Sequence, residues 1–190
     1  MRRYFAIIVL LLVLSLITAC NSQVMSDNGM LSAEDTKHLQ FYYRTSGDVD
    51  ELLHFLNLRF NESYDSNTPY QVLNADTLRI ISGMEYKQVV NIVEGKLDSL
   101  YFYFDETYDE QAAAHLLSLM DSLSESYGDP ITYPGIEDRI LPNMQNLDPG
   151  QTYVEIWDAG NGVDCKVNLE LFGEEENRVI LLRIIYVPHK

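Results

Sequence analysis

Residues 86–104, which read YKQVVNIVEGKLDSLYFYF, decide the fold of this chain. Two runs rich in β-branched and aromatic residues flank Glu94-Gly95-Lys96, a pattern typical of a β-hairpin. In the second run, Leu100, Phe102 and Phe104 alternate with Tyr101 and Tyr103. Successive side chains of a strand point to opposite faces. The alternation therefore predicts one face in the core and one tyrosine-lined surface.

A helix is predicted directly after this hairpin. Thr107 and Glu110 have the spacing of a capping box. An apolar stripe with helical period follows, formed by Ala112, Leu116, Leu119, Leu123 and Tyr127. Gly128 and Pro130 then end the helix, because glycine suits the position after a helix and proline cannot continue it.

The sequence before the hairpin predicts a second helix. Asp48 and Glu51 form another capping pair, and apolar residues with helical period lead us to expect the helix to end near Asn61. Residues 77–82 fit a short strand. For residues 38–45, HLQFYYRT, a first strand and a docking segment both stay open.

Three more strands are predicted near the C-terminus, at residues 152–157, 163–172 and 178–187. The last is almost entirely apolar, which indicates a central strand. The connections are short and imply antiparallel pairing. We therefore expect an α+β fold, namely a two-layer domain with a mainly antiparallel sheet and two helices packed on one face.

The N-terminus has the form of a signal peptide. Arg2 and Arg3 precede an apolar run that is shorter than the roughly 20 residues a membrane-spanning helix needs. The run ends in Ile17-Thr18-Ala19-Cys20, which resembles the lipobox of bacterial lipoproteins. The resemblance implies cleavage before Cys20 and a diacylglycerol on its sulfur.

This resemblance also implies a domain organisation and a location. Residues 1–19 would be the lipoprotein signal peptide, residues 20–36 a flexible tether and residues 37–190 a single α+β domain. The protein would be exported and held by the lipid on Cys20 to the outer face of the cell membrane, or to the outer membrane if the host has two. Two acyl chains give stable anchoring.

The net charge and the cysteine content of the chain limit which classes of ligand it can bind and how its fold is stabilised. Residues 20–190 keep 11 basic against 29 acidic side chains, a net charge of −18 with neutral histidines. Such acidity argues against nucleic acid and anionic lipid headgroups as ligands. With Cys20 acylated, Cys165 has no disulfide partner. Stability must then come from an apolar core, which a chain that is 46% hydrophobic can supply.

A second, looser resemblance covers about half of the chain. A helix ending in Tyr127-Gly128-Asp129-Pro130, then a strand with Trp157 and two further strands, is similar to the β-lactamase-inhibitor-protein-like folds of small lipoprotein domains. The resemblance implies a protein-binding or envelope-assembly module rather than an enzyme.

Patterns that carry catalytic or metal-binding chemistry are missing from the sequence. The four histidines are scattered, and there is no G-x-S-x-G motif. A calcium loop starting at Asp158 would need a glutamate at its twelfth position, where Leu169 stands, so a glycine-rich hairpin turn fits better. Cys165 falls on the expected core side of its strand. We predict no catalytic residue, metal or cofactor. Two alternatives stay open: a cell-envelope hydrolase using carboxylates, and a cation- or small-ligand-binding lipoprotein.

Residues 128–150 form the most unusual segment, with four of the six prolines in the chain. A loop of about 20 residues is uncommon in a compact domain and is often functional. We expect it to contact another envelope protein, together with side chains on neighbouring strands. The predicted contact residues are Tyr133, Ile136, Ile140, Leu141, Trp157, Tyr101 and Tyr103. The alternative is a loop that only covers the sheet.

Overall fold

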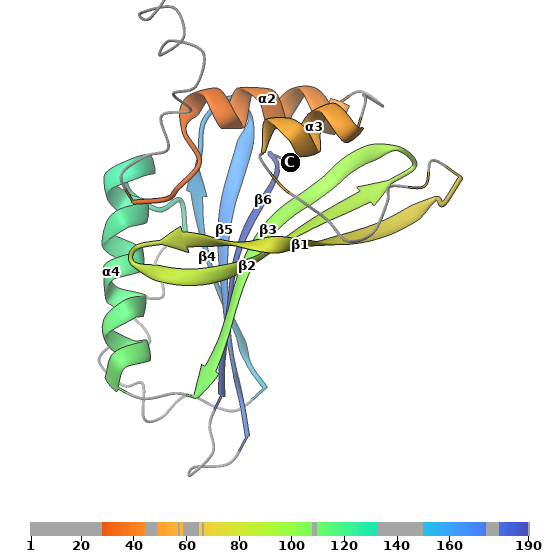
Figure 1. Cartoon of the computed structure of the whole chain (residues 1–190). Coiled ribbons are helices and arrows are strands. Elements are labelled where there is room, and N and C mark those ends of the chain that lie inside the picture. Colours follow the sequence, from red (N-terminus) through yellow and green to blue (C-terminus); the bar gives the residue numbers. More distant parts are fainter. Residues whose placement is uncertain are drawn as a thin grey trace, which may run out of the picture.

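The computed structural model describes residues 28–44, 49–56, 58, 65, 67–107, 110–132, 150–173 and 179–189. Within these ranges it contains six strands and three helices in the order α2, α3, β1, β2, β3, α4, β4, β5, β6 (Figure 1). The helices are α2 (Ala33–Arg44), α3 (Val49–Phe55) and α4 (Glu110–Tyr127). The strands are β1 (Tyr70–Ile81), β2 (Met84–Val93), β3 (Lys96–Thr107), β4 (Thr152–Asp158), β5 (Val163–Phe172) and β6 (Val179–Pro188).

The six strands form one antiparallel sheet in the order β1-β2-β3-β6-β5-β4. The predicted α+β fold is confirmed, as is the central position of the apolar strand β6. The sheet turns along β3, whose residues Lys96–Tyr103 pair with β2 and whose residues Leu100–Thr107 pair with β6 (Figure 1). The β1–β2 hairpin therefore runs across the direction of β4, β5 and β6.

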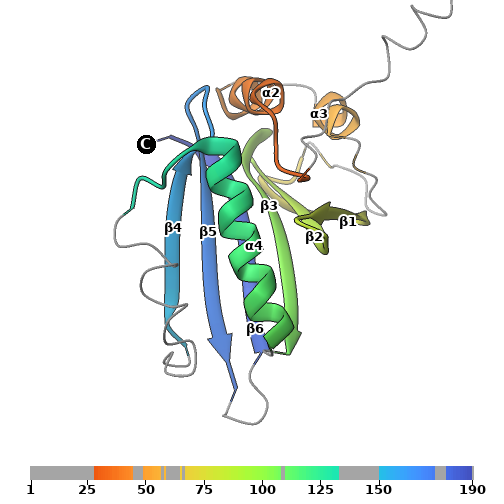
Figure 2. The same cartoon turned by 90° about the vertical axis from the view of Figure 1, so that its left-hand side faces the viewer.

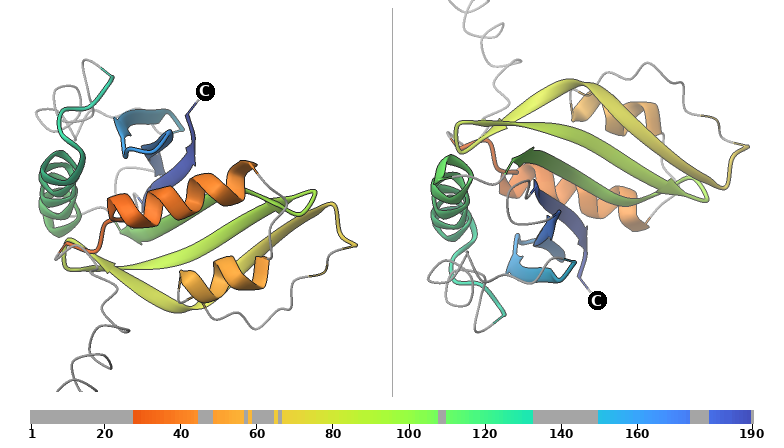
Figure 3. Two further views of the ribbon diagram at one scale, coloured as in Figure 1. Left: turned by 90° about the horizontal axis from the view of Figure 1, so that it is seen from above. Right: turned by 90° about the horizontal axis from the view of Figure 1, so that it is seen from below.

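All three helices lie on one side of the bent sheet. Helix α4 runs along β3, β6, β5 and β4 (Figure 2), and α2 and α3 lie above the β1–β2 hairpin (Figure 3). Seen from below, β1, β2 and β3 lie in front of α2 and α3 (Figure 3). The core forms between these layers, as the apolar stripe of α4 and the alternation of the strands require. Among its fully buried side chains are Leu116, Leu123, Phe102, Trp157, Ile184 and Tyr186.

Several predicted boundaries were wrong. Residues 38–44, for which a strand and a docking segment were both open, belong to α2, with Leu39 and Tyr42 buried at helical spacing. Helix α3 ends at Phe55, well before Asn61. Strand β1 begins at Tyr70 instead of Thr77, because a bulge between Asn74 and Leu78 interrupts its alternation. The predicted helix count of two is one short of the three in the described ranges.

The predicted tether is also too long, because its last nine residues, 28–36, are part of the folded body. Met30 is fully buried and Leu31 is 2% exposed. Ser32 and Asp35 cap α2 reciprocally: the Asp35 amide donates to Ser32 Oγ, and the Ser32 amide donates to Asp35 Oδ2 at 2.8 Å. Residues 20–27 and the proposed lipidation site Cys20 lie outside the described residues.

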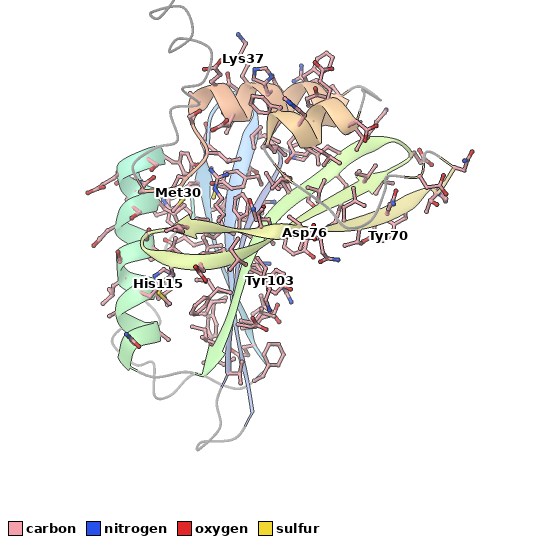
Figure 4. All side chains as sticks on the ribbon, viewed as in Figure 1. Met30, Lys37, Tyr70, Asp76, Tyr103 and His115 are labelled. Atoms are coloured by element: carbon pink, nitrogen blue, oxygen red, sulfur yellow. The ribbon has the colours of Figure 1, made fainter. Side chains whose placement is uncertain are left out.

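We call residues 28–32 the N-terminal lock, because polar groups hold them on three sides. The Ser82 amide donates to the Asn28 carbonyl at 3.0 Å, and the Asn28 side chain donates to the Ser122 carbonyl of α4 at 3.2 Å. The guanidinium of Arg79 donates to the Gly29 carbonyl at 2.7 Å and lies over the Phe102 ring. Figure 4 shows Met30 between α4 and the strands.

Tyrosine hydroxyls complete the lock. Tyr127 donates to the Leu31 carbonyl at 2.9 Å and shares a hydrogen bond with the Tyr186 hydroxyl at 2.8 Å. Burial raises the pKa of both phenols, so they stay neutral and act only through hydrogen bonds. Burying Met30 and Leu31 stabilises the fold by roughly 1.5–3 kcal/mol for each side chain.

Candidate functional site

The candidate site is the side of the sheet that faces away from the helices, which we call the open face. Neighbouring strands place their outward side chains in rows, such as Leu78, Lys87, Tyr103, Arg183, Asn168 and Val154. A second row runs Asn74, Val89, Tyr101, Ile185, Lys166 and Ile156. The face therefore combines side chains from all six strands.

Exposed apolar side chains gather on this face. Six of the nine large hydrophobic residues that are exposed in the described ranges point outward here, namely Tyr70, Leu78, Ile80, Val154, Phe172 and Val179. Ile80 is 62% exposed and Leu78 is 51% exposed. The remaining three lie apart, on α2, on α4 and just after α4. Most of the exposed large apolar side chains of the described residues thus share one face of the sheet, and exposed apolar surface marks interaction sites more often than polar surface does, so the open face is the candidate contact surface.

Tyr101 and Tyr103 occupy the middle of the open face, on the strand along which the sheet bends. Both are half-buried, and their ring centroids lie 6.3 Å apart. Figure 4 shows Tyr103 and His115 on opposite sides of the sheet. Burial raises the pKa of Tyr101, and the nearby Arg183 lowers it in part. The structure confirms that Leu100, Phe102 and Phe104 face the core and that these tyrosines face outward.

Charges on the open face are largely paired. Lys87 Nζ lies 3.0 Å from Asp105 Oδ1 and 5.1 Å from the centroid of the Tyr103 ring. Arg183 Nη1 lies 2.9 Å from Glu170 Oε1. These pairs leave the centre of the face close to neutral, whereas the whole chain has a net charge of −16. A polar, aromatic and aliphatic surface of this kind can bind another molecule through shape and apolar contact.

Trp157 is not part of any exposed contact surface, so its predicted role is wrong. It pairs with Cys165 on the helix side of the sheet and is 1% exposed. The indole follows the alternation of β4, in which Glu155 and Trp157 point to the core while Val154 and Ile156 point outward. Its large apolar ring is stabilised more by burial among the core side chains than by exposure.

Of the predicted contact loop, the structure describes residues 128–132 and the last residue, Gly150. The Ile131 amide donates to the Ile156 carbonyl at 2.7 Å, and the Ile156 amide donates to Thr132 Oγ1 at 3.1 Å. The chain thus leaves α4 along the outer edge of β4. The predicted contact residues Tyr133, Ile136, Ile140 and Leu141 lie outside the described residues, so their role stays a prediction.

Burial holds two titratable groups of the core in their neutral forms. His115 Nε2 lies 2.6 Å from the Tyr86 hydroxyl, and burial lowers the pKa of the imidazole to about 4. Cys165 is fully buried, and burial raises the pKa of its thiol to about 12. At neutral pH the imidazole is therefore uncharged and the thiol protonated. A thiol in this state is a poor nucleophile.

The Asp158–Asp164 segment forms the expected hairpin turn. The Ala159 amide donates to the Val163 carbonyl, and Gly160 and Gly162 have positive φ. Asn161 donates from its side chain to the Ala33 carbonyl at 2.8 Å, which fixes the turn against α2. In the part of the chain that the structure describes, no three acidic, histidine or cysteine side chains are grouped as metal ligands.

Comparisons with known proteins add no relative: neither a family model, nor a curated protein, nor a solved structure matches this chain. Both sequence resemblances therefore stay predictions. Among the described residues, no helix is long and apolar enough to cross a membrane.

Sequence reasoning identified Tyr101 and Tyr103 but missed their apolar neighbours on β1 and β6. The signal for β1 was present in Leu78-Arg79-Ile80-Ile81. Arg79 points inward to the N-terminal lock, so the two apolar residues beside it must point outward. A sequence pattern alone favours the opposite assignment, with the arginine in solvent.

Proposed function

We propose that this protein is a lipid-anchored, non-enzymatic binding module of the cell envelope, and that it contacts a partner protein through the open face of its sheet. The observation that carries the binding role is that six exposed apolar side chains lie on the same face of the sheet as Tyr101 and Tyr103. The lipobox-like segment ending at Cys20 supports the anchor. The N-terminal lock supports a firm link between the anchored end and the body.

The anchor is tested separately from the binding role. The full chain is expressed in a bacterium, and its intact mass is measured in the membrane fraction. We expect loss of residues 1–19 and a gain of mass that matches acylation of the cysteine. Cys20→Ala should remove both changes. A wild-type chain that retains residues 1–19 without acylation would contradict the anchor.

The binding role is tested by site-specific photo-crosslinking in cells that make the wild-type anchored protein. A photoreactive amino acid replaces Ile80 on the open face or, as the matched control, Leu117, which is 44% exposed on α4. We expect a discrete adduct with one envelope protein from position 80 and none from position 117. The same adduct from both positions, or no adduct from position 80, would refute the role of the open face.

A further inference from the structure

The side chains at one corner of the open face indicate which polarity and charge a partner must have to bind there. Register places Leu78 beside Lys87, Ile80 beside Glu85 and Lys87 beside Tyr103 on adjacent strands. Asp105 completes this group of six through its ion pair with Lys87. We call these residues the hairpin corner. They lie on β1, β2 and β3, where the sheet bends (Figure 1).

The hairpin corner combines exposed apolar groups with an excess of negative charge. Leu78 and Ile80 are each more than half exposed. The corner has one cation, Lys87, and two carboxylates, Glu85 and Asp105. Asp105 neutralises Lys87 at 3.0 Å, and within the described residues Glu85 has no ion pair. Asp76, exposed in the bulge of β1, adds a further negative charge nearby.

The net charge of each candidate ligand distinguishes those that the hairpin corner would attract from those that it would repel. A second copy of residues 20–190 would bring another net charge of −18, and an anionic lipid surface would also be repelled. A cationic segment would be attracted over a distance. The exposed aliphatic side chains require that one side of that segment be apolar, because a purely hydrophilic peptide would leave Leu78 and Ile80 uncovered.

We propose that the hairpin corner binds a cationic amphipathic segment of the partner protein. This proposal rests on the proposed function, because it specifies the chemistry of the same partner. The apolar side of the segment covers Leu78, Ile80 and the Tyr103 ring, and its lysines or arginines lie against Glu85, the carboxylate of the corner that has no ion pair among the described residues. Strands β1 to β3 span roughly 10 Å, from two strand spacings. Two turns of helix cover about the same length, so side chains at helical spacing reach both groups.

The test uses three 18-residue peptides and the acylated full-length protein in neutral phosphatidylcholine nanodiscs, with empty nanodiscs subtracted. One peptide of leucine and lysine has helical amphipathic spacing. The second is a scramble of the same composition, and the third has glutamate in place of lysine. We expect the first to bind at least tenfold more tightly than its scramble, with no binding of the third. Equal binding of the first two would overturn the proposal, since charge alone would then account for it.

Protein variants locate the contact. Leu78→Ser combined with Ile80→Ser should raise the Kd of the amphipathic peptide about tenfold, and Glu85→Lys should raise it independently. Leu117→Ser is the matched control and should leave the Kd unchanged. Far-UV circular dichroism checks that each variant is folded. An unchanged Kd in both corner variants would refute the proposal.

The crosslinking experiment distinguishes a failure of the cationic-segment proposal from a failure of the proposed function. A specific adduct from position 80 without peptide binding would show that the open face binds a partner whose chemistry differs from a cationic amphipathic segment. Absence of the adduct would refute the binding face itself.

Discussion

The two faces of strand β1 differ in which side chains they bury: a charged side chain is buried on one face, and apolar side chains are exposed on the other. Arg79 points to the helix side, where it holds the Gly29 carbonyl at 2.7 Å, while Leu78 and Ile80 point to the open face and are mostly exposed. On one side a charged group is buried because the N-terminal lock supplies its acceptors. On the other side apolar groups stay in water. The comparison shows that a charged side chain is buried on the helix side only where acceptors meet it, whereas the open face, where we propose the contact, leaves apolar side chains exposed.

Strand β4 offers the largest test of this contrast. Trp157→Ala removes a fully buried indole and should lower the free energy of unfolding by about 4 kcal/mol, from the transfer term and the cavity that remains. Val154→Ala, three residues away on the open face, should lower it by roughly 0.5 kcal/mol or less. Urea unfolding followed by circular dichroism measures both. Similar losses in the two variants would mean that the two faces of β4 do not differ as the structure has them.

The N-terminal lock is tested by a pair of glycines with similar backbone conformation. Gly29 has φ +80, and an added Cβ would lie 1.9 Å from the Ile80 carbonyl oxygen. Gly83 has φ +83, but open space surrounds its Cβ position. We expect Gly29→Ala to destabilise the fold by about 3 kcal/mol, because backbone must move, and Gly83→Ala by about 1 kcal/mol through strain alone.

The same pair shows whether the lock matters for the body as a whole. If Gly29→Ala lowered stability no more than Gly83→Ala, residues 28–32 would be only loosely attached. Limited proteolysis gives a second readout, because release of the lock exposes the chain around Met30 to cleavage. Wild type and Gly83→Ala should resist cleavage there.

Acid should weaken the helix side through His115. Its pKa is about 4 in the fold and 6.5 in the unfolded chain. Below pH 6.5 the imidazole is protonated in the unfolded chain but stays neutral in the native state. The free energy of unfolding therefore falls as pH drops from 6.5 toward 4. The expected loss is about 2 kcal/mol by pH 5. The pH dependence from this group fades only about one pH unit above the unfolded pKa, where the unfolded imidazole has lost its proton too.

His115→Gln is the control for this titration, because its amide can still bond the Tyr86 hydroxyl but does not ionise. Unfolding free energies are measured from pH 7 to pH 5 for both proteins. We expect the wild type to lose stability more steeply over this window. Parallel pH profiles would show that the imidazole titrates normally and is not shielded in the core.

Some elements could be predicted from sequence because local rules govern them. The hairpin of β2 and β3 follows from alternation on both sides of Glu94-Gly95-Lys96, and α4 from a capping pair and a helical stripe. Gly128 ends α4 with φ +80. Helix α2 could also have been found, because Ser32 and Asp35 have capping-box spacing. For residues 38–45 the sequence left a strand and a docking segment both open, since short aromatic runs do not by themselves distinguish strand from helix.

The candidate site was accessible to sequence reasoning only in part. Tyr101 and Tyr103 were found because strand alternation is a local rule. Trp157 was misplaced because exposure depends on which face of β4 meets the helices. An aromatic residue beside a long loop resembles a binding residue when only the sequence is known.

By itself, the sequence determined the element types of most of the chain, its acidity and the expectation of a lipid anchor at Cys20. Only the tertiary structure decided the strand order, the bend along β3, the burial of Met30 and the direction of Trp157. The physical reason is the range of the interactions. Capping, helical period and strand alternation act between residues a few positions apart. The N-terminal lock and the open face depend on contacts between segments far apart in the chain, such as Arg79 with Gly29 and Tyr127 with Leu31.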